Sequence, residues 1–160
     1  MNLMARVQGF MDGELERLSG SLAEKYGVSR DEVAGSVGAF LQETYGPAMH
    51  LAEAISSKKD PVIVFIGREG CNICQRSIPP LERFLQEHSD LELVKLDYSE
   101  PAALLYHMIL QTDKGMLPLI AMVSEGCIRM VFTGEAVATE VYQRHYSSLR
   151  SECSQNVYAH

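Results

Sequence analysis

The residues of this sequence best suited to chemistry are two cysteines three positions apart, Cys71 and Cys74. Thiols at positions i and i+3 of a helix share one face and lie close enough to form a disulfide. Residues 62–66 form a continuous β-branched and aromatic run, which predicts a buried strand, and residues 71–88 have helical spacing. Cys71 would therefore lie at a helix N-terminus, where unpaired N–H groups and the helix dipole favour a thiolate.

This placement predicts different roles for the two thiols. Cys71, at the start of the helix, would attack a substrate disulfide as the nucleophile. Cys74, one turn further in and more shielded, would then attack the mixed disulfide as the resolving thiol and release the reduced substrate. We therefore predict a redox-active disulfide between Cys71 and Cys74.

Two further cysteines, Cys127 and Cys153, lie far from this pair along the chain. Four thiolates can hold a structural zinc ion, so a structural metal-binding protein is one alternative function. The spacings are long, however, and do not repeat the Cys-x-x-Cys pattern, and cysteine is among the most buried residue types. We interpret Cys127 and Cys153 as packing residues and predict no metal and no cofactor.

The segments around the pair indicate an α/β fold. Ser124-Glu125-Gly126 is expected to join two strands as an antiparallel hairpin. The order of the elements suggests a mixed central sheet with helices on both faces. The expected strands are 62–66, 91–97, 119–123 and 128–132, and the expected helices are 71–88, 101–110 and 136–152.

Beyond the two cysteines, residues 61–152 resemble thioredoxin at several positions. The matching residues are Pro79, five positions after Cys74, the pair Leu117-Pro118 ahead of a strand, and Gly126 and Gly134. Thioredoxins carry a helix-kinking proline, a cis-proline beside the active site and two glycines at these places. The resemblance implies a thioredoxin-like mixed sheet flanked by helices, a cis peptide before Pro118, and substrate binding by Leu117 and Pro118.

Other positions depart from the thioredoxin pattern. Phe65 stands where thioredoxins bury an aspartate that accepts the proton of the resolving cysteine, although Lys95 matches the lysine that accompanies this aspartate. Gly70 replaces the tryptophan before the first cysteine, and Asn72-Ile73 replaces the Gly-Pro between the cysteines. These differences indicate a divergent relative.

The first 60 residues form a different region, which we predict to be an all-helical extension ahead of a thioredoxin-like domain at 61–160. Apolar residues recur every three or four positions in its first helix, which Gly27 ends. Ser29-Arg30-Asp31-Glu32 has the form of a capping box that opens a second helix, and Pro47 suits the first turn of a third.

The apolar stripe of the first helix must be buried, either in a small bundle against the domain or between two chains. We therefore expect a possible homodimer through the N-terminal helices. We expect residues 61–160 to fold without the extension, because their own strands and helices form a complete two-sided sheet.

The overall charge of the chain limits its partners. The net charge is −7, which disfavours nucleic acid and anionic lipid. Residues 22–41 resemble a helix-turn-helix, but Asp31 and Glu32 stand where phosphate contacts would be needed. No apolar run approaches the roughly 18–20 residues that span a bilayer, and acidic residues interrupt the N-terminus early, unlike a signal peptide. We predict no nucleic acid partner, no membrane association and a cytoplasmic location.

These observations together predict a thiol–disulfide oxidoreductase that acts on protein or small-molecule disulfides. Its expected partners are disulfide-containing protein clients and an electron-donating reductase. The first alternative is a non-enzymatic redox-sensing or interaction module, in which the disulfide changes how the helical extension docks. The second is the structural metal-binding protein.

Overall fold

A four-stranded mixed β-sheet lies at the centre of the chain, which the computed structural model describes over residues 1–112 and 115–149. The strand order is β2-β1-β3-β4, with β1 parallel to β2 and antiparallel to β3, and β3 antiparallel to β4. The strands are β1 (Val62–Gly67), β2 (Glu92–Asp97), β3 (Leu119–Ser124) and β4 (Cys127–Thr133). The four predicted strands and the hairpin between the last two are confirmed.

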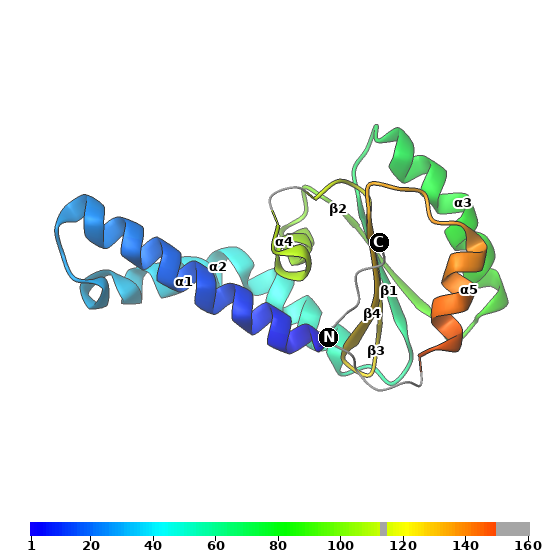
Figure 1. Ribbon diagram of the computed structural model, residues 1–160, viewed down its shortest axis with the longest axis horizontal. Helices are drawn as coiled ribbons and strands as arrows, with labels where there is room; N and C mark the ends of the chain where they lie inside the picture. Colours follow the sequence, from blue (N-terminus) through cyan, green and yellow to red (C-terminus); the bar gives the residue numbers. More distant parts are fainter. Residues whose placement is uncertain (113–114, 150–160) are drawn as a thin grey trace.

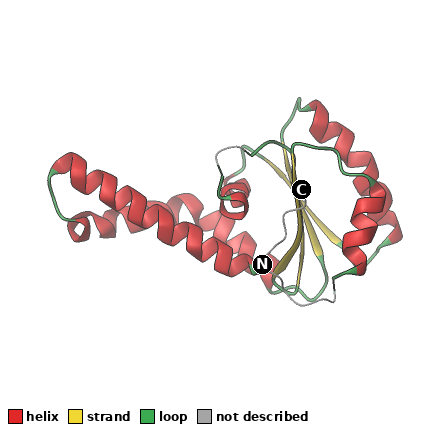
Figure 2. Cartoon of the chain, viewed as in Figure 1, coloured by secondary structure: helices red, strands yellow, loops and turns green. Residues whose placement is uncertain are grey.

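Helices cover both faces of this sheet (Figures 1 and 2). One face carries α3 (Asn72–Glu87) and α5 (Thr139–Ser147), and the other carries η1 (Pro101–Leu104), α4 (Leu105–Leu110) and part of α2 (Arg30–Ser56). The predicted α/β architecture is confirmed. The last helix is shorter than the predicted 136–152, and residues 150–152 lie outside the described part of the chain.

The side chains of β1 alternate between two apolar clusters, because successive residues of a strand point to opposite faces. Ile63 and Phe65 pack with α3 and α5, while Val62, Val64 and Ile66 pack with α2 and α4. The residues of β3 divide in the same way. This double burial explains why β1 has an unbroken apolar sequence.

The N-terminal region is an antiparallel pair of long helices, α1 (Leu3–Tyr26) and α2, whose far end projects from the sheet as an arm (Figure 1). Gly27 ends α1 in the left-handed conformation, with φ of 64°. The predicted capping box at the start of α2 is present: the Glu32 N–H donates to Ser29 Oγ at 3.3 Å, and the Ser29 N–H donates to a Glu32 carboxylate oxygen at 2.9 Å.

The expected third helix does not exist, because α2 continues through Pro47 to Ser56. Proline inside a helix removes the N–H that would bond to the carbonyl four residues earlier. Here Pro47 and Glu43 are both exposed, so water can satisfy that carbonyl. Ala48 and Ala52 are fully buried beyond the proline, and their packing holds the continuous helix.

The base of the arm belongs to the apolar core of the sheet. Leu3, Val7 and Ile55 are at most 2% exposed and share one cluster with Val62 and Val64. The expectation that residues 61–160 complete both faces of the sheet by themselves is therefore wrong, since α2 covers part of one face. The domain boundary between residues 60 and 61 stays a prediction.

Two polar links fix the start of α1 to the rest of the chain. The Arg6 side chain donates to the carbonyls of Ile109 and Leu110 at 2.8 and 3.1 Å, which satisfies the C-terminus of α4. The Leu3 N–H donates to the Gly126 carbonyl at 2.8 Å, beside the hairpin of β3 and β4. The arm is thus attached at two separate points.

Replacing Tyr142 by phenylalanine should leave the free energy of unfolding unchanged or raise it by about 1 kcal/mol. Tyr142 is fully buried against Phe84, its hydroxyl has no hydrogen-bond partner, and burial raises its pKa. The matched control is Tyr106→Phe, which loses a hydrogen bond to the Met116 carbonyl and should be destabilised. Urea denaturation measures both, and a loss of more than about 1 kcal/mol in Tyr142→Phe would contradict the prediction.

Among the described residues, no helix is both long and apolar enough to cross a membrane.

Candidate redox site

A tight turn leads from the end of β1 to the cysteine pair. The Cys71 N–H donates to the Arg68 carbonyl at 3.3 Å, and Gly70 in this turn has φ of 76°. That left-handed conformation at the third position of a turn favours glycine, which explains the residue that replaces the tryptophan of thioredoxins. The turn places Cys71 at the N-cap of α3.

Cys71 and Cys74 form a disulfide in the structure, with their Cα atoms 5.2 Å apart. The Cys71 sulfur also accepts the Cys74 N–H at 3.2 Å, as an N-cap side chain does. Cys71 is partly exposed, whereas Cys74 is only 3% exposed. The difference in access that the helical spacing predicted is therefore present.

The surroundings of Cys74 are apolar on the side of the sheet. A Cβ atom added to Gly67 would lie 2.9 Å from the Phe65 ring and 3.4 Å from the Cys74 sulfur, so the three residues meet closely. Lys95 is the partner of Phe65 in the register of β1 and β2. Cys74, Phe65 and Lys95 line a cleft of about 390 Å³ that opens to solvent.

The Leu117–Pro118 peptide is cis, as the resemblance implied. The Pro118 carbonyl accepts the Gly134 N–H at 3.0 Å, and Gly134 has φ of 71°. Leu117 and Cys71 both pack against the apolar cluster that contains Cys74. Cys71, Cys74 and Leu117 thus border one apolar cluster, and Pro118 follows Leu117 in the chain.

Asp97, at the end of β2, ties the turn before Cys71 to the segment that follows β2. One of its carboxylate oxygens accepts the Ser99 hydroxyl at 2.5 Å and the Ser99 N–H at 2.9 Å. These two bonds, and a further one from the Glu69 N–H, lower the pKa of Asp97. The Tyr98 N–H adds a bond of 2.7 Å to the Gly67 carbonyl.

Replacing Asp97 by asparagine should loosen this connection at neutral pH. Because the folded-state pKa of Asp97 is lowered, its carboxylate stabilises the fold above its unfolded pKa of about 3.9, and the contribution is lost as the pH falls through the lower folded value. The urea midpoint of Asp97→Asn should therefore lie below that of the native chain at pH 6, and the gap should close towards pH 2. An equal gap at both pH values would contradict this assignment.

Several residues near the pair were not predicted from the sequence: Arg68, Tyr98, Tyr106 and His107. They line a second cleft together with Leu117. The signal available in the sequence was weak, since Arg68 is the third residue before Cys71 and nothing marks the tyrosines. Their proximity depends on the links through Gly67 and Asp97.

Cys127 is buried at the start of β4, and its strand pairing places it at the end of the sheet opposite to Cys71. Cys153 lies outside the described residues. Within the described ranges, no group of three histidine, cysteine or acidic side chains could hold a metal ion.

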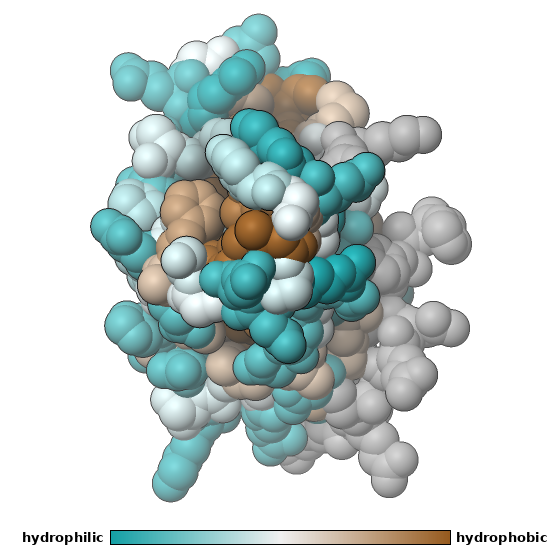
Figure 3. All heavy atoms as spheres, turned by 90° about the vertical axis from the view of Figure 1, so that its left-hand side faces the viewer, coloured by the Kyte–Doolittle hydropathy of each residue, from teal (hydrophilic) through white to brown (hydrophobic). Residues whose placement is uncertain are grey.

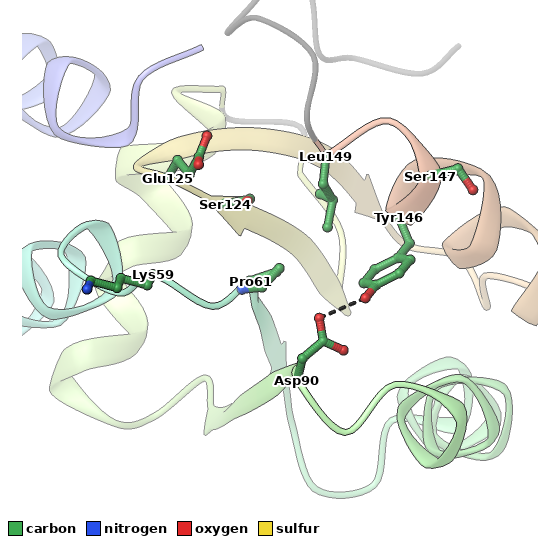
Figure 4. Close-up of a pocket in the computed structure, with 8 residues that line it drawn as sticks. All are labelled: Lys59, Pro61, Asp90, Ser124, Glu125, Tyr146, Ser147 and Leu149. Carbon is green, nitrogen blue, oxygen red and sulfur yellow. Dashed lines mark hydrogen bonds between the residues drawn. The ribbon is translucent and has the colours of Figure 1, made fainter.

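The same opposite end of the sheet carries a separate cleft of about 540 Å³ (Figure 4). Pro61 and Ser124 line it, and so do Tyr146 and Asp90, where the Tyr146 hydroxyl donates to an Asp90 carboxylate oxygen at 2.7 Å. No cysteine is among its described lining residues, and it lies at the other end of the sheet from the Cys71–Cys74 pair.

The sequence matches no protein-family model and no curated protein. The fold is similar to many solved structures. One, from a study of thiol resolution in the yeast mitochondrial 1-Cys peroxiredoxin via glutathione and thioredoxin systems, has a TM-score of 0.50 at 16% identity and covers 61% of this chain and 87% of that one. Thioredoxin from Fasciola hepatica has a TM-score of 0.49 at 22% identity, and the match covers 62% of this chain and 92% of that one. Desulfothioredoxin from Desulfovibrio vulgaris has a TM-score of 0.49 at 20% identity, and the match covers 61% of this chain and 88% of that one.

Together with the strand order, the helices on both faces and the cis Pro118, the first of these likenesses shows a thioredoxin-like fold. The chain carries a Cys-x-x-Cys disulfide at the start of α3 in that fold. Sequence identities this low support a shared fold and not a shared activity.

Proposed function

We propose that this protein is a thiol–disulfide oxidoreductase that acts on protein or small-molecule disulfides. The observation that carries the proposal is the disulfide at the N-terminus of α3, with a partly exposed Cys71 and a buried Cys74. A helix N-terminus stabilises a thiolate, and an exposed thiolate is the group that attacks a disulfide. Leu117 and Pro118 would contact the substrate segment beside it.

The reaction would proceed in two exchanges. The Cys71 thiolate attacks one sulfur of the client disulfide, forms a Cys71–client disulfide and releases the other client sulfur as a thiolate. The Cys74 thiol gives up its proton to water and attacks the Cys71 sulfur, which closes the Cys71–Cys74 disulfide and releases the second client thiolate. Two electrons pass from the cysteine pair to the client, and an external dithiol reductant restores the pair.

A turnover assay tests the proposal. The oxidised full chain is mixed, in catalytic amount, with a protein disulfide and dithiothreitol, and client thiols are measured over time. We expect the rate to rise in proportion to the amount of chain added, well above that of dithiothreitol alone. A rate equal to that of dithiothreitol alone would contradict the proposal.

The surroundings of Cys74 favour one alternative, a redox-sensing module that reacts once per signal. Phe65 stands beside Cys74 where a proton acceptor would speed the second exchange, and the arm adds a surface for a partner. In this alternative the chain would exchange disulfides stoichiometrically but would not turn over. An assay with substrate in large excess over the chain distinguishes the two functions: an oxidoreductase reduces many disulfides per chain, and a sensing module reduces one.

The remaining partner proposals follow from the same chemistry. Disulfide-containing clients and an electron-donating reductase would act in the cytoplasm, where dithiols stay reduced. A homodimer through the arm is also proposed. Seen from the far end of the arm, an apolar patch lies within a hydrophilic surface (Figure 3). Tyr26 and Val28, at the turn between α1 and α2, are both exposed. Sizing chromatography of native chain and Val28→Asp would test it.

A further inference from the structure

A second cleft, of about 380 Å³, opens beside the Leu117–Pro118 turn on the side of η1 and α4. Its walls are the rings of Tyr98, Tyr106 and His107, and Arg68 and Leu117 lie on its border. Arg68 also lines the cleft beside Cys74, so its side chain stands between the two hollows. A client bound at the cysteine pair would therefore place its neighbouring groups near this cleft.

The walls of the cleft are held in place by contacts within the chain. The Tyr106 hydroxyl donates to the Met116 carbonyl at 3.3 Å, and the Tyr98 and Tyr106 rings meet edge to face at 5.6 Å. The Tyr98 oxygen lies 3.2 Å from His107 Nε2. When His107 carries its proton on Nε2 it donates to Tyr98, and the Tyr98 hydroxyl is then able to donate to a ligand. The cleft is thus preformed, with one polar group at its mouth.

The charges around the cleft differ from those of the whole chain, which is strongly acidic. Among its described lining residues there is an arginine and a histidine but no carboxylate. The cleft therefore offers a cationic border on an acidic protein.

Glu69, Asp97 and Glu100 are the acidic residues that line the cleft beside Cys74 together with Arg68, and the last two accept backbone N–H groups. Asp97 accepts the N–H groups of Ser99 and Glu69, and Glu100 accepts the Asp97 N–H at 2.8 Å. Within the described part of the chain, the Arg68 guanidinium makes no ion pair and no hydrogen bond. Arg68 is exposed and lines the cleft, so its five N–H donors are open to a ligand, and their planar fork matches a carboxylate.

We propose that this cleft binds a carboxylate of the substrate close to its reactive sulfur, and that Arg68 selects substrates carrying one. The inference deepens the proposed function, because the position of the carboxylate is defined relative to a sulfur exchanging with Cys71. The carboxylate could belong to an acidic residue that flanks a cysteine in a protein client, or to a small disulfide such as 3,3′-dithiodipropionate. Both offer the same chemistry to Arg68 and Tyr98.

Equilibrium binding tests the inference without depending on turnover. The oxidised full chain is titrated into labelled peptides in which serine replaces the reactive cysteine and the flanking residue is glutamate, glutamine, lysine or phenylalanine. A charge-assisted bond to arginine should make the glutamate peptide bind about tenfold more tightly than the glutamine peptide, with lysine weakest. Arg68→Gln should abolish this preference, and Arg68→Lys should retain part of it.

Arg76→Gln is the matched control, since Arg76 is an exposed arginine on α3 that does not line the cleft. It should keep the preference for glutamate. Equal binding of all peptides, no measurable binding of the glutamate peptide, a preference for phenylalanine, or a preference that survives Arg68→Gln would overturn the inference.

Reduction assays then identify the source of the carboxylate. Preference for the glutamate peptide disulfide over the glutamine one points to protein clients, while a faster reaction of 3,3′-dithiodipropionate than of the neutral hydroxyethyl disulfide points to small substrates. A charge preference in binding with no turnover of any disulfide would support the cleft and contradict the oxidoreductase. Turnover without any charge preference would support the oxidoreductase and contradict carboxylate binding in the cleft.

Discussion

Replacing Cys71 by serine should reduce disulfide exchange to the background rate of the external reductant. Cys71 is the partly exposed thiol at the N-terminus of α3, and a serine hydroxyl neither ionises near neutral pH nor forms a disulfide. Cys74→Ser should behave differently, because Cys71 can still attack a client once. That variant should accumulate one Cys71–client disulfide per chain and stop.

The measurement combines turnover with intact mass. Client thiols are followed over time, and the adduct on each variant is weighed. Asn72→Ser is the matched control, an exposed polar residue on the same turn of α3, and it should retain catalysis and form no stable adduct. A stable adduct on Cys71→Ser and none on Cys74→Ser would reverse the two roles.

Removing residues 1–60 should unfold the remainder of the chain. Leu3, Val7 and Ile55 are each at most 2% exposed and cover the β1 side chains Val62 and Val64. Full burial of one such aliphatic side chain is worth about 1.5–3 kcal/mol, and whole domains are stable by roughly 5–15 kcal/mol. Removing three such side chains, and exposing the face of the sheet beneath them, would lower the free energy of unfolding by an amount comparable with its total.

Circular dichroism and urea denaturation of residues 61–160 and of the full chain would measure this. Point variants keep the test independent of the truncation. Ile55→Asp should destabilise the full chain severely, whereas Gln42→Asp, at an exposed site on α2, should cost little. A fragment with the same cooperative transition as the full chain would contradict the prediction.

Much of the fold could be predicted because the signals are local. The uninterrupted β-branched and aromatic run of β1 is typical of a strand buried on both faces. The capping box at Ser29 is formed by hydrogen bonds between residues only three positions apart. Pro47 shows the limit of this reasoning. A helix can run through a proline when water reaches the carbonyl four residues earlier, which has lost its N–H partner. Whether water reaches that carbonyl depends on tertiary packing.

The site divides in the same way. The spacing of Cys71 and Cys74 and their position after β1 were sufficient to predict the disulfide. The cleft beside them could not be found, since Arg68 and Tyr98 come together only because β2 lies next to β1 and Asp97 binds the turn before Cys71. No periodicity in the sequence reports such a contact between separate segments.

The order in which the two thiols react shows whether Cys71 is the nucleophile. The fully reduced chain is treated with a limiting amount of iodoacetamide at mildly acid pH, and the site of labelling is identified by peptide mass spectrometry. We expect Cys71 to be alkylated first and Cys74 only after the chain is unfolded. Labelling of Cys74 before Cys71, or of both at the same slow rate as in the unfolded chain, would contradict it.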